Sequence, residues 1–230
     1  MKFKFYCGIL FFFLVAHKLH AQSSRILHDL YKLRNSTTVL YLAAHPDDEN
    51  TRMISWLTNG YGARTAYLSL TRGDGGQNLI GKELGPELGV LRTQELLHAR
   101  RIDGGEQFFS RAVDFGYSKT ADETLEKWDR KAVLSDVVYV IRKFRPDVII
   151  TRFPPDSRGG HGHHIASAML GIEAFKSAAD PDAFPEQLER VDTWQPKRIY
   201  WNASTWWNPK LDSLAKVDDQ YLSAEVGGYS

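Results

Sequence analysis

Residues 39–49, VLYLAAHPDDE, decide the fold, because six apolar residues run directly into a histidine, a proline and three carboxylates. A short apolar run of this kind is typical of a buried strand. Residues 48–59 follow with helical periodicity, with Met53, Ile54 and Leu57 on the apolar side and Gly60 as the expected stop. The stretch therefore predicts a strand that ends in a charged turn at the start of a helix.

The same alternation continues along the chain. Further strands are expected at residues 65–70, 107–113, 148–151 and 198–202. Helices are expected at residues 86–101, from the capping-box residue Thr120 to Pro146, and at residues 165–178. Residues 180–196 are polar with three prolines and predict a surface loop. Strands that alternate with helices predict an α/β fold, with a mostly parallel sheet and helices on both faces.

Composition excludes several classes of protein. The 230 residues are 43% hydrophobic and 25% charged, as in an ordinary globular chain, and the length favours one domain. The 29 basic and 28 acidic residues give a net charge of +1, without a run of like charges. We therefore expect no nucleic-acid or membrane-surface partner.

The N-terminus predicts export. Lys2 and Lys4 precede an apolar run at residues 5–16, and residues 1–21 end in Ala21 like a secretory signal peptide. An N-terminal anchor is the alternative, but the run is shorter than the ~20 residues that span a bilayer, so we expect no stable membrane insertion after cleavage. Residues 22–230 would then be a single periplasmic or extracellular domain. Cleavage also removes Cys7, the only cysteine, which leaves no thiolate ligand, thiol nucleophile or disulfide.

Two short segments hold four of the six histidines that remain after cleavage. One is residues 44–49, and the other is residues 159–164, GGHGHH, a few residues after a later strand. Because ligands bind outside the carboxyl ends of parallel strands, we expect the two segments to meet there. Imidazole and carboxylate ligands suit zinc, although another divalent metal would also fit, and a catalytic zinc keeps three protein ligands and one water.

His45, Asp48 and one histidine of the second segment would complete that ligand count. Asp47 and Asp48 are neighbours whose side chains point in different directions, so one can bind the metal while the other takes a proton from the metal-bound water. A remaining histidine would stabilise the oxyanion or protonate the leaving group. If a helix begins at His161, then His161 and His164 share one face and His163 points elsewhere.

Structural explanations compete with these assignments. An Asp pair at a helix start can serve only as a cap, and a Gly-His loop can bind metals adventitiously. The loop at residues 73–76 lacks the third glycine of a dinucleotide fingerprint, and Glu83 stands where a phosphate loop needs Ser or Thr. We interpret that loop as backbone that lets a substrate approach closely.

Four segments together resemble the PIG-L or LmbE-like family of zinc-dependent N-acetylglucosaminyl deacetylases. They are residues 44–49 (AHPDDE), 71–78 (TRGDGGQN), 91–96 (LRTQEL) and 161–164 (HGHH), within a likeness that runs from about residue 37 to 202. The resemblance implies a Rossmann-like fold and a zinc ion held by His45, Asp48 and His164. It also implies Asp47 as the base that activates water, His161 as the group that stabilises the oxyanion or protonates the amine, and Arg92 as a residue near the substrate.

Two departures from the family pattern matter. The family usually has Pro-Asp inside the second histidine motif, whereas this chain has Gly162 and His163, which makes His163 a competing candidate ligand. The family domain also commonly continues past the last strand, so we expect the domain to be truncated at Ser230.

The function predicted from the sequence is an exported zinc-dependent hydrolase. It would remove an N-acetyl group from an amino sugar or glycoconjugate, with metal-bound water attacking the amide. The alternatives are a metal-dependent amidase acting on another acylated amine, or an inactive carbohydrate-binding module. A pure binding site would not need a base such as Asp47 beside the metal, which argues against the module.

Overall fold

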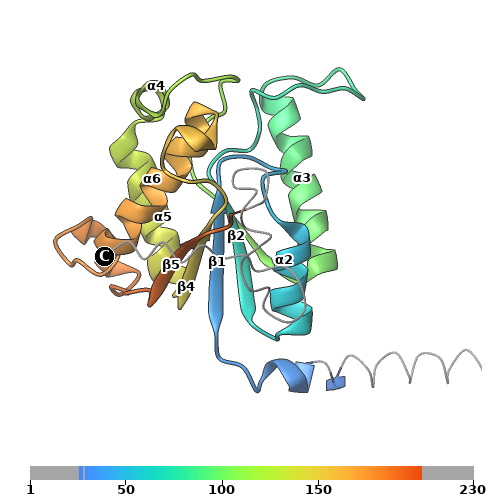
Figure 1. Cartoon of the computed structure of the whole chain (residues 1–230), viewed down its shortest axis with the longest axis vertical. Coiled ribbons are helices and arrows are strands. Elements are labelled where there is room, and N and C mark those ends of the chain that lie inside the picture. The colour runs from blue at the N-terminus through green and yellow to red at the C-terminus, as the bar shows by residue number, and fades with distance from the viewer. Residues whose placement is uncertain (1–25, 28, 204–230) are drawn as a thin grey trace, which may run out of the picture.

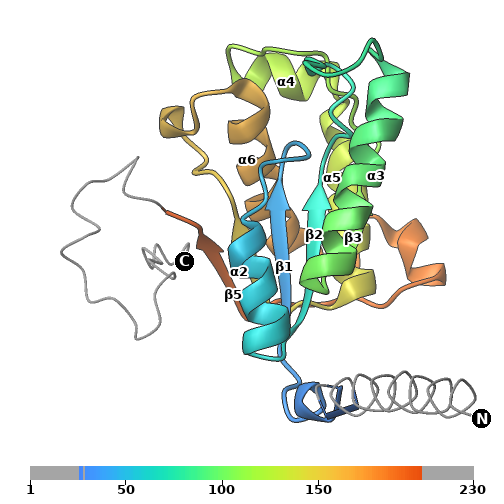
Figure 2. The same cartoon turned by 90° about the vertical axis from the view of Figure 1, so that its right-hand side faces the viewer.

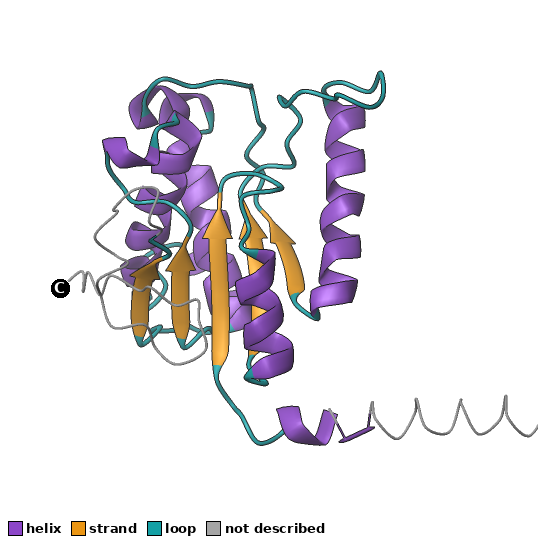
Figure 3. Cartoon of the chain, turned by 45° about the vertical axis from the view of Figure 1, so that its right-hand side comes forward, coloured by secondary structure: helices purple, strands orange, loops and turns teal. Residues whose placement is uncertain are grey.

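The computed structural model describes residues 26–27 and 29–203, which form a parallel sheet between two layers of helices (Figure 1). The strands are β1 (Thr38–Ala43), β2 (Arg64–Ser69), β3 (Glu106–Phe109), β4 (Val148–Thr151) and β5 (Arg198–Trp201). They pair in the order β3-β2-β1-β4-β5, every pair parallel, and all point the same way (Figure 3). The α/β class expected from the sequence is confirmed. The predicted signal peptide, residues 1–21, and everything after residue 203 lie outside the described residues.

Helices cover both faces of the sheet. One face carries α2 (Thr51–Ser55), the π-helix η1 (Trp56–Gly60) and α3 (Pro86–Asp103), and Figure 2 shows α2 and α3 in front of β1 and β2. The other face carries α4 (Ala121–Lys127), α5 (Arg130–Phe144) and α6 (Gly162–Ser177). Alternate residues of β1 serve the two cores, Val39 and Tyr41 on the α2 side and Leu40 and Leu42 on the α5 side. Burial on both faces explains why the strand is an uninterrupted apolar run.

The long helix expected between Thr120 and Pro146 is two helices. Thr120 caps α4 as predicted, because its side chain accepts the N–H of Glu123 at 3.2 Å. The chain then turns at Asp129, whose φ of 55° is left-handed and whose side chain caps α5 by accepting the N–H of Ala132. Trp128, at the break, is buried and its indole N–H donates to the Val113 carbonyl. The apolar periodicity runs through the break because both helices pack on the same core.

Other boundaries shift by a few residues. Helix α2 begins at Thr51 with Asn50 as its cap, so residues 45–48 form a turn rather than a helix start. The third strand ends at Phe109 instead of continuing to residue 113. Helix α6 begins at Gly162 instead of residue 165, with His161 as its N-cap.

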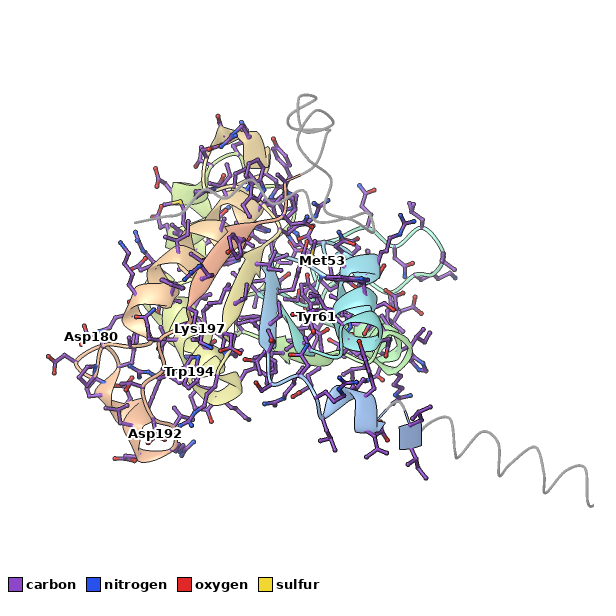
Figure 4. All side chains as sticks on the ribbon, turned by 60° about the horizontal axis from the view of Figure 1, so that its bottom comes forward. Met53, Tyr61, Asp180, Asp192, Trp194 and Lys197 are labelled. Carbon is purple, nitrogen blue, oxygen red and sulfur yellow. The ribbon has the colours of Figure 1, made fainter. Side chains whose placement is uncertain are left out.

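The surface loop expected at residues 180–196 contains one short 3-10 helix, η3 (Pro185–Glu189). It lies on the far side of β5 from α2, as the labelled Asp180, Asp192 and Trp194 show against Met53 and Tyr61 (Figure 4). Arg142 of α5 is 1% exposed and donates to the Asp180 and Ala183 carbonyls, both at 2.7 Å. The loop is therefore fastened to the helix layer beneath it. Among the described helices, none has the length and apolar character needed to cross a bilayer.

Candidate metal and catalytic site

The structure brings the two histidine segments together at the C-terminal edge of the sheet. Residues 44–49 follow β1, residues 159–164 span the end of the loop after β4 and the first residues of α6, and β1 pairs directly with β4. The ring centroid of His45 lies 5.5 Å from that of His161, 5.1 Å from that of His163 and 5.3 Å from that of His164. The adjacency of the two parallel strands is what places these distant segments side by side.

Among the residues that the structure describes, two groups of side chains have donor atoms close enough to share one ion. His45, Asp48 and His164 form the first group, and His45, His161 and His163 form the second, each with donor atoms within 4.8 Å of one another. In the first group, Asp48 Oδ2 lies 3.2 Å from His45 Nδ1 and Asp48 Oδ1 lies 3.5 Å from His164 Nε2. Two imidazoles and a carboxylate are the donor set of catalytic zinc sites, so the first group fits such an ion.

His164 is oriented by its surroundings. Its Nδ1 lies 3.2 Å from the Gly159 carbonyl, which can only accept a hydrogen bond, so this nitrogen carries the proton. Phe153 stacks on the ring with centroids 3.7 Å apart. The other nitrogen, Nε2, therefore presents its lone pair toward Asp48, and a backbone carbonyl of this kind commonly supports a metal-binding histidine.

His163 does not point away from the site, contrary to the expectation from helical spacing. It is fully buried, and its Nδ1 lies 2.9 Å from His45 Nε2. Phe115 and Trp128 pack on the ring, with centroids 4.4 and 4.7 Å away. Helical spacing places His163 off the face that His161 and His164 share, but α4 and the loop before it cover that side of α6 and keep the ring beside the site.

Burial and the contact between Asp48 and His45 together set the protonation of the cluster. Burial and the neighbouring imidazoles lower the pKa of His161 to about 4 and that of His163 to about 3, and burial also lowers the pKa of His164. Burial favours protonated Asp48, but its hydrogen bond with His45 outweighs this effect and holds the pKa of Asp48 below its usual value. At neutral pH His161, His163 and His164 are neutral and Asp48 is ionised, which are the states that bind a metal ion. Burial alone would lower the pKa of His45, but the hydrogen bond and the charge of Asp48 outweigh it and hold that pKa above its usual value.

Asp47 occupies a different environment from Asp48. The Asp47 side chain is 71% exposed and that of Asp48 is 10% exposed, so the two neighbours diverge as expected. The backbone of Asp47 is left-handed, with φ 86°. Arg92 of α3 donates from Nη2 to Asp47 Oδ2 at 2.8 Å and to the Pro46 carbonyl at 2.9 Å. Arg92 therefore holds a carboxylate that lies outside both groups of donor atoms.

A cavity of about 370 Å³ opens beside the cluster. Its lining brings together His45, Asp47, Arg92 and His161 with the glycine loop and two residues that sequence reasoning missed, Asp114 and Tyr117. These two belong to no motif, and the signal that could have indicated them is their position just after β3, at the same sheet edge. A Cβ on Gly75 would clash with the Gly116 nitrogen, so a glycine there lets these two loops close around the cavity.

Fold and site together define a parallel α/β protein with a candidate metal centre at the C-terminal edge of its sheet. The chain belongs to the GlcNAc-PI de-N-acetylase (PIG-L) family, whose model matches residues 40–175. The family resemblance read from the four sequence segments is thereby confirmed.

Two curated relatives illustrate the family. The chain is 31% identical over 176 residues to a mycothiol S-conjugate amidase of Streptomyces coelicolor, covering 69% of this chain and 58% of that protein. It is 28% identical over 223 residues to a 1D-myo-inositol 2-acetamido-2-deoxy-alpha-D-glucopyranoside deacetylase of Corynebacterium urealyticum, covering 83% of this chain and 65% of that protein. The chain thus spans less than two thirds of the length of either relative.

A solved structure shares the fold. The N,N'-diacetylchitobiose deacetylase of Pyrococcus horikoshii matches with a TM-score of 0.57 and 20% identity, covering 74% of this chain and 61% of that one. At this identity the likeness concerns the fold alone.

Proposed function

We propose that this protein is a zinc-dependent N-deacetylase that removes an acetyl group from an amino sugar or glycoconjugate. The observation that carries the proposal is the group of His45, Asp48 and His164 beside a cavity that also contains Asp47. A metal site next to a solvent-facing carboxylate is the arrangement that hydrolysis of an amide requires. Family membership supports the same chemistry, since one relative is a deacetylase of an N-acetylated aminosugar–inositol conjugate.

His45, Asp48 and His164 would hold the zinc ion. When bound, zinc supplies a Lewis acid that polarises the amide carbonyl and makes water acidic enough to deprotonate near neutral pH. Asp47 lies in the cavity, outside that ligand group, so it can take the proton from the attacking water. Arg92 orients Asp47 through the 2.8 Å hydrogen bond and borders the space left for the sugar.

His161 is placed to act on the other side of the amide. Its Nδ1 accepts the N–H of His163 at 3.1 Å, so a neutral His161 carries its proton on Nε2. The Ser118 N–H also approaches Nε2, at 3.4 Å, but this contact is longer and weaker. His161 would stabilise the oxyanion or give its proton to the departing amine.

A second candidate keeps the metal and changes the substrate to another acylated amine. The observation that favours it is the likeness to a mycothiol S-conjugate amidase. An inactive carbohydrate-binding module would leave the cavity-facing Asp47 without a purpose.

One assay separates these candidates. The full-length gene product, loaded with zinc and analysed for metal, is incubated with N-acetylglucosamine, chitooligosaccharides, N-acetylglucosaminyl-inositol and non-sugar N-acyl amines, and acetate and free amine are measured. We expect one equivalent of metal and acetate release from the amino sugars. Turnover of the non-sugar amines alone would favour the amidase, and a zinc-loaded protein without any turnover would favour the binding module.

We further propose that the protein acts after export. The support is the charged and apolar pattern of residues 1–21. Expression of the full gene in a bacterial host, followed by fractionation and N-terminal sequencing, should recover a chain that begins at Gln22 outside the cytoplasm. A chain that keeps Met1 and stays in the cytoplasm would contradict export.

A further inference from the structure

Glu49 is the third carboxylate of the 44–49 segment, and its side chain has different contacts from those of Asp47 and Asp48. Its side chain is 5% exposed, and its Oε2 accepts the backbone N–H of Asp47 at 2.9 Å. Its other oxygen, Oε1, lies 3.5 Å from Arg100 Nη2 on α3. A buried carboxylate thus joins the backbone of Asp47 to the helix that packs beside α2, as Figure 2 shows for the two helices.

The backbone that Glu49 holds is strained. Asp47 has φ 86°, in the left-handed region that residues with a Cβ adopt only when their surroundings require it. The other described non-glycine residues with positive φ are Asp129, Arg145 and Phe184, and each of them caps a helix. Asp47 caps none. Its conformation turns the carboxylate toward the cavity while Asp48 turns toward His45.

Arg100 is fixed independently of the turn. Its guanidinium is 4% exposed, and its Nε donates to Asp103 Oδ2 at 3.0 Å. It also lies over the ring of Tyr67, 5.5 Å from the centroid, and the Tyr67 hydroxyl donates to the carbonyl of His45. One buried network therefore contacts the turn at both ends, at the His45 carbonyl and at the Asp47 N–H.

We infer that Glu49 is a positioning residue, which fixes the left-handed backbone of Asp47 by accepting its N–H and thereby aims the Asp47 carboxylate into the cavity. Arg100 and Asp103 hold Glu49 in place for this task. The inference rests on the proposed role of Asp47 as the base. A base displaced by about 1 Å can cost about 10²-fold in rate, so the turn matters even though Glu49 touches no substrate.

Two variants isolate the hydrogen bond. Glu49→Gln and Glu49→Met have side chains of similar length, and both remove the charge opposite Arg100, but only glutamine can accept the Asp47 N–H. We expect Glu49→Met to lose about 10- to 100-fold in kcat, with KM changed less than about two-fold and one equivalent of metal retained. Glu49→Gln should stay within about three-fold of wild-type kcat, because the acceptor is kept. Equal kcat values in the two variants would overturn the inference.

Asp147 offers a matched control. Its carboxylate accepts the N–H of Thr38 at 2.9 Å and pairs with Lys197 at 2.7 Å, at the opposite end of the sheet. Asp147→Asn should lower the melting temperature and leave kcat unchanged. If Asp147→Asn reduced kcat as much as Glu49→Met does, the effect of Glu49 would be one of general stability, and the positioning role would fail.

Hydrogen exchange gives a readout that needs no turnover. In the wild-type protein the Asp47 amide, followed by NMR, should exchange slowly, remain protected in Glu49→Gln and exchange faster in Glu49→Met. If the wild type hydrolyses nothing but shows this pattern, the proposed function fails while the positioning by Glu49 stands. An Asp47 amide that exchanges freely in the wild type overturns the positioning, even if Glu49→Met does not fold.

Discussion

At the scale of single residues, environment separates carboxylates that are adjacent in the chain. Asp48 is held by His45 and lies among imidazoles, Asp47 faces the cavity, and Glu49 is buried against α3. Three consecutive carboxylates thus lie in three different environments. Their chemistry differs because each is desolvated and hydrogen-bonded differently, which is how one short segment can supply a ligand, a base and a support.

Asp47→Asn tests the base. The amide keeps the size and the contact with Arg92 but cannot take a proton from water, so kcat should fall about 10²- to 10⁴-fold. Metal content should remain near one equivalent and KM should change far less than kcat. Asp136→Asn, which alters a partly buried carboxylate paired with the exposed Arg111, is the control and should keep full activity. Loss of the metal in Asp47→Asn would make Asp47 a ligand instead.

The choice between the two neighbouring histidines can be tested with leucine variants. His164→Leu should abolish stoichiometric zinc, since it removes a proposed ligand. His163→Leu keeps the packing between Phe115 and Trp128 but removes the contact with His45, and loss of such a supporting group weakens metal affinity about 10- to 100-fold. At saturating zinc this variant should still bind one equivalent. Equal loss in both variants would place His163 among the ligands.

At the scale of elements, the strands were easier to predict than the turns between helices. The apolar runs of β1 and β4 are buried on both faces, so their composition alone indicates strands. The break at Asp129 was missed because its evidence is a left-handed cap and a tertiary hydrogen bond from Trp128, neither of which disturbs the apolar periodicity. The left-handed turn at Asp47 was missed for the same reason, since its support comes from Glu49 and the distant Arg100.

We expect the hydrogen bonds of Arg142 to stabilise the loop between α6 and β5. It is buried and donates to backbone carbonyls of that loop, so Arg142→Met removes a buried donor from several carbonyls at once. The free energy of unfolding should fall by about 2–4 kcal/mol, measured by urea denaturation. Arg111→Met removes only the ion pair that the exposed Arg111 side chain makes with Asp136 and should cost less than about 1 kcal/mol. A similar cost in both variants would contradict a special role for Arg142.

Asp147 contacts Thr38 at the start of β1 and Lys197 just before β5, and these contacts should make the stability of the protein sensitive to acid. Burial alone would raise the pKa of Asp147, but hydrogen bonds from Lys197 and Thr38 outweigh it and hold the pKa below its usual value. The folded state therefore binds this proton less readily than the unfolded state, so the stabilisation is present above about pH 4 and is lost as the pH falls further. The stability difference between wild type and Asp147→Asn should shrink between pH 5 and pH 3. A difference that stays constant over this range would show that the charge of Asp147 is irrelevant.

At the scale of the whole molecule, the site exists only when the sheet is assembled. The meeting of the two histidine segments could be predicted, because carboxyl ends of parallel strands share one edge. The place of His163 could not, because it depends on how Phe115 and Trp128, from other parts of the chain, pack over α6. Asp114 and Tyr117 join the cavity through the same long-range packing.

Metal binding and folding should therefore be coupled. His45 and Asp48 follow β1 while His164 belongs to α6, so an ion bound by all three binds the folded chain and not the unfolded one. At a zinc concentration 100 times Kd, this linkage adds about 2.7 kcal/mol, which corresponds to a rise of about 5–10 °C in melting temperature for a domain of this size. A chelator should reverse the rise. His45→Ala and Asp48→Ala should lose both the bound metal and the zinc-dependent rise, whereas Asp47→Asn should keep both. If His45→Ala retains a full equivalent of metal and the same rise, the ion binds elsewhere and the site proposed at this edge of the sheet is wrong.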